Sequence, residues 1–162
     1  MPIALLPGAY AHSTGQCAIT VNSPTMGQVM QSSVCSPAGG LDLNLERRTP
    51  LLVITAPSTG ALTLDFTTGV RSIGLFAALL APVGTPYEAT LGVRLAGEPD
   101  FVDMPPVAGM SDHVCLPGDS TTAAFLSAGV DAGERIEAIR VQLNCDEPSG
   151  KLAIGWLYHW MN

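Results

Sequence analysis

The sequence predicts an all-β protein: a two-sheet antiparallel β-sandwich, jelly-roll-like. Apolar residues recur at every second position in one segment after another, which is the spacing of a strand with one buried face. Helix signals are sparse, because no segment combines a cap, an apolar stripe at helical spacing and a glycine stop. The 17 glycines and 13 prolines supply the turns that many short strands require.

Roughly eight or nine strands follow from this alternation. Leu41, Leu43 and Leu45, for example, alternate with polar residues. The segment 26–34 suits either a strand or a short helix. The strands expected from the pattern are 17–22, 41–46, 51–55, 62–67, 70–80, 89–96, 121–126, 137–144 and 151–162.

Two of these strands are expected to form a hairpin. Leu62, Leu64 and Phe66 alternate with polar residues, and the Thr-Thr-Gly turn at 67–69 then leads into 70–80. Within the second segment, 73–81 is the one run that could be helical. We assign it as a strand because a glycine interrupts it near its start and turn residues bound it.

The closing segment predicts a buried strand, because apolar and aromatic residues occupy one of its two faces. One face holds Leu152, Ile154, Trp156, Tyr158 and Trp160, and the other holds Lys151, Ala153, Gly155, Leu157 and His159. We expect the first set to face the core.

Length and composition limit the partners. A chain of 162 residues is the size of one domain, and we expect one sandwich over 1–162 with a less regular N-terminal segment, 1–40, packed on it. The formal charge of −7, from 14 acidic and 7 basic residues, disfavours nucleic acids and anionic membranes. The longest apolar run, 73–83, is too short for a membrane-spanning helix and contains Pro82, so no membrane insertion is expected.

The four cysteines are too far apart for a zinc site built from paired ligands. The most economical disulfides join Cys17 to Cys35 and Cys115 to Cys145. Each would stabilise the fold by about 3 kcal/mol. Four buried thiols are the alternative, because cysteine is among the most buried residue types.

No motif predicts catalysis. The nucleotide-binding, hydrolase-nucleophile and zinc-protease motifs are absent, and Ser111, Asp112 and His113 are neighbours in the sequence, whereas triad members meet through folding. No two of the 14 carboxylates stand out as a glycosidase pair. We therefore do not expect an enzyme or a cofactor.

One acidic, proline-punctuated loop carries a candidate cation site. Glu98, Asp100 and Asp103 lie there, and Asp112 and Asp119 follow in the next loop. Ca²⁺ binds several oxygen ligands from flexible loops, so the first three residues are calcium candidates. The EF-hand order is missing, and a solvated acidic loop is the alternative.

Arginines and tyrosines mark candidate interface positions. Arg71, Arg94 and Arg140 each follow a β-branched residue in an expected strand. If they point outward, they protect the sheet surface or contact a partner. Tyr10 and Tyr87 are expected to be exposed, where tyrosine often contributes to interfaces.

Residues 60–160 resemble bacterial and phage-type extracellular jelly-roll domains. The stretches that carry the resemblance are GALTLDFTTGVRSIGLFAALL, EATLGVRLAG, an acidic loop, ERIEAIRVQLN and a closing KLAIGWLYHW. It implies a non-catalytic domain that serves carbohydrate binding, adhesion or surface display. The chain departs from those domains because it has no recognisable signal peptide and no sorting tail.

These departures favour a structural or interaction protein, a subunit of a larger extracellular or virion assembly such as a decoration or tail component. Its partners would be copies of itself or neighbouring subunits, and its location the virion or an extracellular surface. A secreted carbohydrate-binding or adhesion module, with a glycan as partner, is the alternative. A glycan-processing enzyme is a second alternative.

Deletion of residues 152–162 is expected to unfold the protein. Losing one buried aromatic ring costs about 3–5 kcal/mol, a large part of the stability of a typical domain. Circular dichroism and the melting temperature of the shortened chain test this expectation. A native spectrum with an unchanged melting temperature would show that the last strand is not part of the core.

Overall fold

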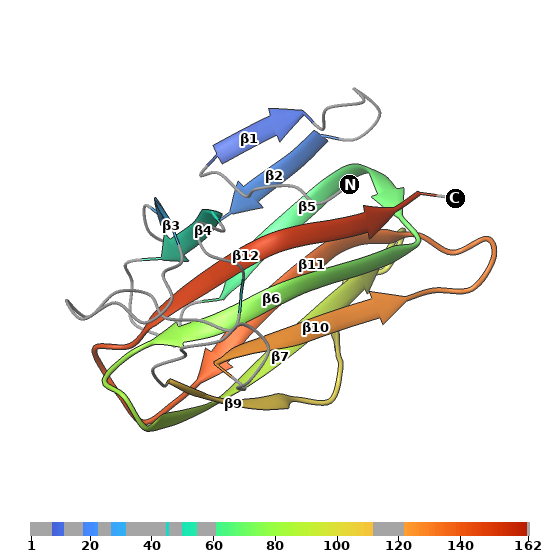
Figure 1. Cartoon of the computed structure of the whole chain (residues 1–162). Coiled ribbons are helices and arrows are strands. Elements are labelled where there is room, and N and C mark those ends of the chain that lie inside the picture. Colours follow the sequence, from blue (N-terminus) through green and yellow to red (C-terminus); the bar gives the residue numbers. More distant parts are fainter. Residues whose placement is uncertain are drawn as a thin grey trace.

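The computed structural model describes residues 8–11, 18–22, 27–31, 45, 50–54, 61–111 and 122–161. For 8–11, 18–22, 27–31, Pro50 and Trp156 the description covers the backbone alone. Twelve strands within these ranges form two sheets that stack face to face (Figure 1). In chain order they are β1 (Gly8–Ala11), β2 (Ala18–Asn22), β3 (Gly27–Gln31), β4 (Pro50–Ile54), β5 (Leu62–Val70), β6 (Ser72–Leu80), β7 (Thr85–Leu95), β8 (Val102–Asp103), β9 (Val107–Ser111), β10 (Ala123–Gly129), β11 (Ile136–Asn144) and β12 (Lys151–Trp160).

The seven-stranded sheet has the order β1-β2-β5-β11-β7-β8, with β9 also paired to β7. The five-stranded sheet has the order β10-β6-β12-β4-β3. Every pairing in the described part of the chain is antiparallel. The predicted all-β, two-sheet antiparallel, jelly-roll-like sandwich is therefore confirmed. Among the described residues, no helix is long and apolar enough to cross a membrane.

The core lies between the facing sides of the two sheets. Alternation places every second side chain there, so that Leu62, Leu64 and Phe66 of β5 are at most 2% exposed. The largest fully buried side chains of this core are Leu52, Leu62, Leu64, Ile73, Leu75, Leu79, Leu91, Ile136 and Ile139. Burying one such side chain stabilises the fold by about 1.5–3 kcal/mol, which makes this layer the main source of stability.

The predicted hairpin of 62–67 with 70–80 is wrong. β5 lies in the seven-stranded sheet and β6 in the five-stranded sheet, so the chain crosses from one layer to the other at Arg71. Gly69, with a φ of +66°, turns the backbone just before the crossing. The N–H of Arg71 donates to the carbonyl of Trp160 at 2.7 Å, and its carbonyl accepts from the N–H of Val130 at 3.0 Å. Alternation predicts both strands, but pairing depends on contacts that are distant in the sequence.

Other ambiguous segments are strands. Residues 73–80 belong to β6 rather than to a helix, and the described part of 26–34 is β3. Of the expected strand 41–46, only Leu45 is described, and it lies in a bend. Leu45 is 6% exposed and belongs to a second apolar cluster with Leu51, Val53, Ala78, Ala123 and Ala153. This cluster covers part of the outer side of the five-stranded sheet.

The closing strand β12 contains a β-bulge. Its register with β6 shifts between Ile154 and Leu157, so that two residues of β12 stand opposite one residue of β6. The bulge reverses the faces of the residues that follow it. The residue after Ile154 is a glycine, which inside a strand often marks such a feature.

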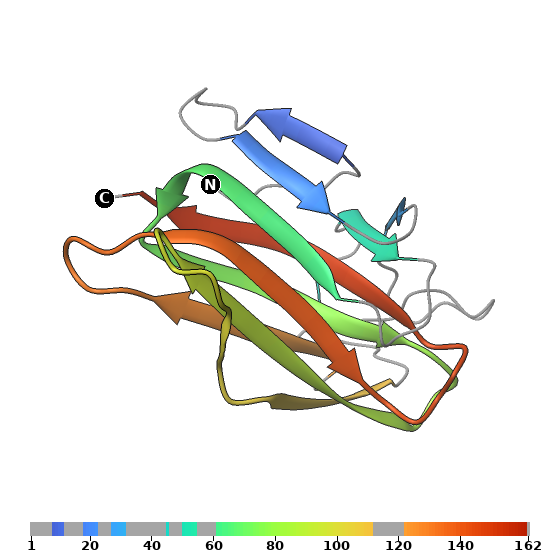
Figure 2. The same ribbon diagram turned by 180° about the vertical axis from the view of Figure 1, so that it is seen from behind.

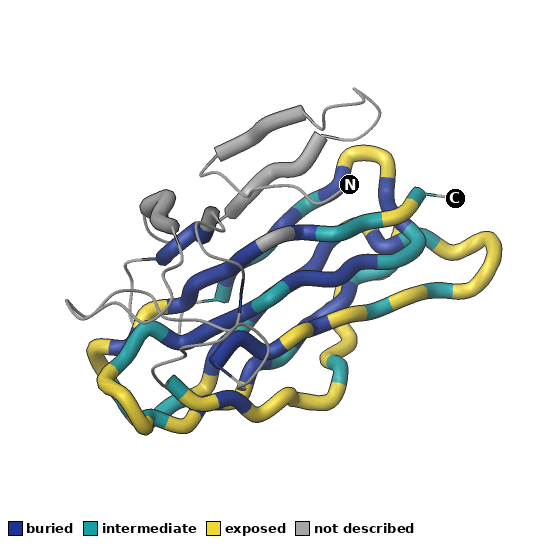
Figure 3. Tube along the Cα trace, in the orientation of Figure 1, coloured by how far each residue is buried: buried dark blue, intermediate teal, exposed yellow. Residues whose placement is uncertain are grey.

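As a result, the predicted burial of Tyr158 and Trp160 alongside Leu152 is wrong. Leu152, Ile154 and Leu157 are at most 1% exposed, whereas Trp160 is 55% exposed. Figure 3 shows exposure increasing along β12 toward its carboxyl end. The strand belongs to the core as predicted, and among its described side chains the fully buried ones are aliphatic residues before and just after the bulge.

Tyr87 of β7 is a buried link between the two sheets. The residue is 3% exposed, and its hydroxyl oxygen lies 2.9 Å from the carbonyl oxygen of Thr122 and 3.1 Å from that of Ala77. The same oxygen accepts a hydrogen bond from the N–H of Ala124 at 3.2 Å. Burial raises the pKa of Tyr87 to about 12, against the opposing effect of the bond from Ala124. The prediction that Tyr87 is exposed is wrong, because alternation along β7 turns its ring inward.

Replacing Tyr87 by phenylalanine is expected to lower the free energy of unfolding by about 1–3 kcal/mol, because the buried N–H of Ala124 and a buried carbonyl lose their partner. Chemical denaturation measures the change. Tyr158→Phe is the matched control, since that half-exposed residue should change stability by less than about 0.5 kcal/mol. Equal effects of the two substitutions would contradict the assigned link.

The same pair of proteins tests the pKa of Tyr87. The folded state keeps the proton up to about pH 12, whereas the unfolded chain releases it near pH 10. The stabilisation is therefore complete below about pH 10 and is lost as pH rises toward 12, by up to about 1.4 kcal/mol per pH unit. We expect the stability difference between the wild type and Tyr87→Phe to shrink over this interval. A constant difference from pH 9 to 12 would contradict a buried, protonated hydroxyl.

Candidate functional site

The outer side of the seven-stranded sheet carries a band of polar side chains. Figure 2 looks onto this side, where β5, β11 and β7 lie next to one another. Alternation turns Asp65, Arg94 and Arg140 outward while their apolar neighbours in each strand enter the core. Two of the predicted interface residues, Arg94 and Arg140, are thus brought together on adjacent strands.

Two ion pairs cross this face in opposite directions. Arg140 of β11 reaches across Gly92 of β7 to Asp103 of β8, with 2.9 Å between Nη2 and Oδ1. Arg94 of β7 reaches the other way, to Asp65 of β5, with a distance of 3.2 Å. Each arginine therefore binds a carboxylate two strands away, so that four strands are joined by two interactions.

Small residues between the partners make this arrangement possible. Ala138 stands between Arg94 and Asp65 in the register, and Gly92 stands between Arg140 and Asp103. A β-carbon added at Gly92 would lie 2.6 Å from Oδ1 of Asp103. A larger residue at position 92 would therefore separate the pair, which explains why a glycine interrupts the strand here.

Phe101 lies beside both guanidinium groups. The ζ-carbons of Arg140 and Arg94 are 4.9 Å and 5.3 Å from the centre of its ring, within the range of cation–π attraction. The ring and the two ion pairs form one cluster at the edge of the sheet. With two arginines and two aspartates, the cluster carries no net charge.

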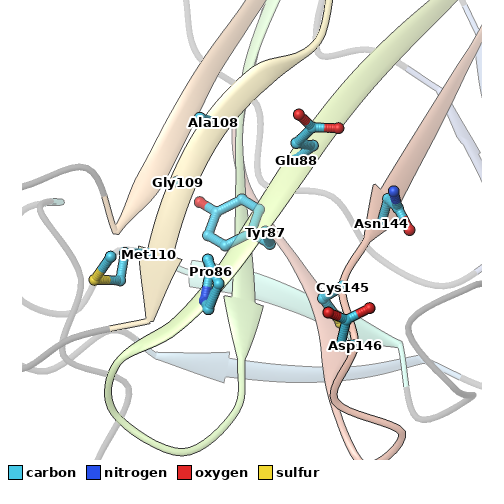
Figure 4. Close-up of a pocket in the computed structure, with 9 residues that line it drawn as sticks. All are labelled: Pro86, Tyr87, Glu88, Ala108, Gly109, Met110, Asn144, Cys145 and Asp146. Carbon is cyan, nitrogen blue, oxygen red and sulfur yellow. The ribbon is translucent and has the colours of Figure 1, made fainter.

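An open pocket of about 480 Å³ lies further along the same side of the sheet (Figure 4). Its polar groups are the side chains of Glu88, Asn144 and Asp146, all of them exposed. The full lining is Pro86, Tyr87, Glu88, Ala108, Gly109, Met110, Asn144, Cys145 and Asp146. These residues come from β7, β9 and the end of β11, so the pocket sits where three strands meet.

The floor of the pocket is tied to the core. Gly109 of β9 pairs with Tyr87 of β7, and a side chain at Gly109 would overlap the tyrosine ring. The ring is held in turn by the hydrogen bonds of its hydroxyl to the opposite sheet. The packing that closes the core therefore also shapes the base of the pocket.

Hydrogen-bonding side chains connect the pocket to the arginine cluster. In the register of β11 with β7, Asn144 stands opposite Glu88 and Gln142 stands opposite Thr90. Arg140 is the next outward residue along β11, and Arg94 lies one pair further along β7. We call this row the polar strip; its members are Glu88, Thr90, Arg94, Arg140, Gln142 and Asn144. From Glu88 to Arg94 it extends about 20 Å at about 3.4 Å per residue. It can contact an extended ligand of several units.

The predicted calcium site at Glu98, Asp100 and Asp103 is not formed. Asp103 is paired with Arg140, and Glu98 and Asp100 are exposed. Over 61–111, 122–161 and the shorter described segments, no group of three His, Cys, Asp or Glu residues could hold a metal ion. Asp112 and Asp119, the other acidic residues of the prediction, lie outside the described residues.

The remaining predicted residues are scattered. Arg71 lies at the crossing between the sheets rather than on a strand face, and it is half-buried. Tyr10 lies in β1, where the description covers only the backbone. Cys145 is a half-buried free thiol, which contradicts the disulfide expected between Cys115 and Cys145. Cys17, Cys35 and Cys115 lie outside the described residues, so the pairing of Cys17 with Cys35 remains a prediction.

The sequence did not single out Glu88, Asn144 or Phe101. Glu88 and Asn144 are outward residues of two strands whose pairing is unknown until the fold is known. Phe101 lies in a loop whose acidic residues are its most prominent feature in the sequence. The available signal was Gly92, because a glycine inside a regular strand often marks close approach by another group.

No family model matches the chain, and no curated protein matches it. Several solved structures are similar. One is a carbohydrate-binding module of family 29, with 12% identity over 90% of both chains and a TM-score of 0.39. Another is CsCBM6-3 from Clostridium stercorarium in complex with cellobiose, with 16% identity over 88% of this chain and 87% of that one and a TM-score of 0.35. A third is TmCBM61 in complex with β-1,4-galactotriose, with 10% identity over 89% and 88% and a TM-score of 0.42.

The ion pair of Arg140 with Asp103 is expected to contribute about 0.5–1 kcal/mol to stability, since both side chains are partly exposed. A double-mutant cycle with Arg140→Gln and Asp103→Asn measures this coupling. The control is a cycle that combines Asp103→Asn with Arg135→Gln. Arg135 directly precedes β11, and this cycle should give less than about 0.3 kcal/mol. Equal coupling in the two cycles would show that the pair is not formed in solution.

Proposed function

We propose that this chain is a non-catalytic glycan-binding module that holds an uncharged glycan along the polar strip. One observation supports the proposal above others: a row of hydrogen-bonding side chains runs from an open pocket to a charge-balanced arginine cluster on an outer face of the sandwich. Such a row matches a ligand that is long, polar and neutral.

The charges of the strip argue for a neutral ligand. Arg94 and Arg140 are paired with carboxylates, so they offer hydrogen bonds without an excess of positive charge. The pocket adds the carboxylates of Glu88 and Asp146. A nucleic acid would be repelled by these groups and by the net charge of −7. A sugar hydroxyl can instead donate to a carboxylate or an amide oxygen and accept from an arginine or an amide N–H.

The pocket and the strip have complementary roles. The pocket offers apolar surface from Pro86 and Met110 next to polar groups, which suits a sugar ring with its C–H and O–H faces. The side chains of Thr90 and Gln142 continue toward the arginine cluster. We expect one sugar unit to be held in the pocket and the following units to lie along the sheet.

A second candidate function is glycan hydrolysis, because two carboxylates, Glu88 and Asp146, line the same pocket. A hydrolase of this kind needs one carboxyl group kept protonated, which enzymes achieve by burial. Both residues are exposed, so the arrangement favours binding over catalysis. An assay for new reducing ends separates the two functions. If the wild type releases reducing ends and Glu88→Gln does not, hydrolysis is favoured over binding alone.

The predicted role as a subunit of a virion or extracellular assembly rests on sequence properties. The predicted location at a virion or extracellular surface has the same basis. Neither is needed for glycan binding, and both remain predictions.

Alanine at Glu88 and at Asn144 is expected to weaken glycan binding at least about tenfold each, because each loses a hydrogen bond to the ligand. A panel of soluble neutral, acidic and basic glycans would first be screened by affinity electrophoresis. The best neutral ligand would then be titrated calorimetrically into the wild type and the variants. Both positions are exposed, so the melting temperatures should stay unchanged.

Glu134→Ala is the matched control, because Glu134 is an exposed carboxylate in the turn before β11, whereas Asn144 ends that strand. It should bind like the wild type. Binding of no neutral glycan, or equal affinity in all variants, would refute the proposal. Preference for a basic glycan would show that the pocket carboxylates dominate recognition.

A further inference from the structure

The outer side of the five-stranded sheet carries an exposed aromatic patch. We call it the aromatic face; its members are Phe76 of β6, Phe125 of β10, and Tyr158 and Trp160 of β12. Phe125 is 47% exposed and Trp160 is 55% exposed. The rings of Phe76 and Phe125 are in contact, with centroids 4.9 Å apart. Apolar groups gathered on one face mark interaction sites, unlike single exposed residues.

Two local features of the backbone place these rings on the surface. The bulge in β12 turns Tyr158 and Trp160 outward, whereas an unbroken register would direct them into the core. Gly74 leaves room for Phe125, whose Cζ lies 2.7 Å from where a β-carbon at position 74 would be. The phenylalanine ring therefore lies across β6 and reaches toward β12.

The aromatic face adjoins a second apolar region on the outer side of the five-stranded sheet, and that second region is buried. Val53, Ala78 and Ala153 lie on the same outer side, and each is 1% exposed within the cluster that includes Leu45. Phe76 packs against this cluster and also contacts Phe125. Figure 3 shows the change from buried to exposed along β12, while β6 stays buried or half-buried throughout. Covering the exposed half would remove further apolar surface from water.

The chemistry of this face suits a protein partner better than a glycan. The positions between the rings are Ser72, Gly74, Ser127 and Gly129, so none of the described residues within the patch is charged. Interface cores are rich in Trp, Tyr and Phe and poor in charged residues. Two copies that each carry a charge of −7 can meet here without bringing carboxylates together. Carboxylate and amide groups of the kind that bind sugar hydroxyls occur instead on the polar strip.

The patch is complementary to itself. Along one row of paired residues Trp160, Ser72 and Gly129 stand side by side, and along the next row Tyr158, Gly74 and Ser127 do so. In these two rows, large rings lie on the β12 side of β6 and small residues on its β10 side, while Phe125 lies one row further along β10 with its ring over Gly74. A two-fold axis parallel to β6 places β12 of one copy over β10 of the other.

We infer that two copies of this chain associate through the aromatic face as a two-fold symmetric dimer. In this arrangement Trp160 packs over Gly129 of the partner subunit, and Tyr158 packs over Ser127 of the partner subunit. The contact is isologous and therefore closed, which limits the assembly to a dimer at this face. The polar strips remain free on the two outer sides, so the inference is independent of glycan binding.

Sedimentation velocity and light scattering of the full chain over a concentration series test the dimer. We expect a mass of twice 16.8 kDa at high concentration. Trp160→Ala and Gly129→Glu should each raise the dissociation constant at least about tenfold, as loss of an aromatic anchor or of its pocket commonly does. Gly129→Glu should fold, because an added β-carbon meets only Ser72 Cβ at 3.7 Å and the Arg71 carbonyl oxygen at 3.9 Å.

Val83→Glu is the control, since Val83 is also 55% exposed but lies in the turn between β6 and β7. It should dimerise like the wild type. A monomer at all concentrations would overturn the inference, as would a dimer that both variants leave unchanged. Glycan binding that is lost in Trp160→Ala, without a dimer, would assign the face to a sugar instead. Dimer loss in both variants, with normal melting temperatures, would support the inference.

Discussion

Side chains on a strand point alternately to its two sides, so the register of each strand decides what the sandwich buries and what it presents. In this protein the register shifts within β11 and within β12, and the shift in β12 has the larger effect on the surface. Before the bulge, Leu152 and Ile154 enter the core; after it, Leu157 does so and Trp160 faces outward. One additional residue in β12 therefore separates the part of the strand that packs in the core from the part whose aromatic side chains face outward.

The two outer sides of the sandwich differ in chemistry, although both are built on the same alternation. On the seven-stranded sheet, arginines and aspartates interlock across small residues in a charge-balanced cluster, which forms one end of a hydrogen-bonding row. On the five-stranded sheet, rings alternate with serine and glycine. A molecule with one polar and one apolar outer side can bind two kinds of partner at once, because neither occupies the surface of the other.

The sequence predicts the strands well and their arrangement less well. β7, β11 and β12 follow from local alternation, which needs no knowledge of neighbours. The hairpin of β5 with β6 was wrong because pairing is a long-range property. Arg94 and Arg140 were singled out separately, but their cluster with Phe101 depends on the adjacency of β7 and β11. Tyr87 was misjudged because a proline before it suggested a loop, whereas its place in the alternation turns it inward.

The hydroxyl of Tyr87 also has a consequence for the rim of the sandwich. Among the described strands, β10 is the last of its sheet, and its partner there is β6. The carbonyl of Thr122 and the N–H of Ala124 contact the tyrosine oxygen, which also lies 3.1 Å from the carbonyl oxygen of Ala77 in β6. The hydroxyl therefore stands between the first residues of β10 and the neighbouring strand. A single phenol, extended from the opposite layer, thus fastens the start of the marginal strand to the rest of its sheet.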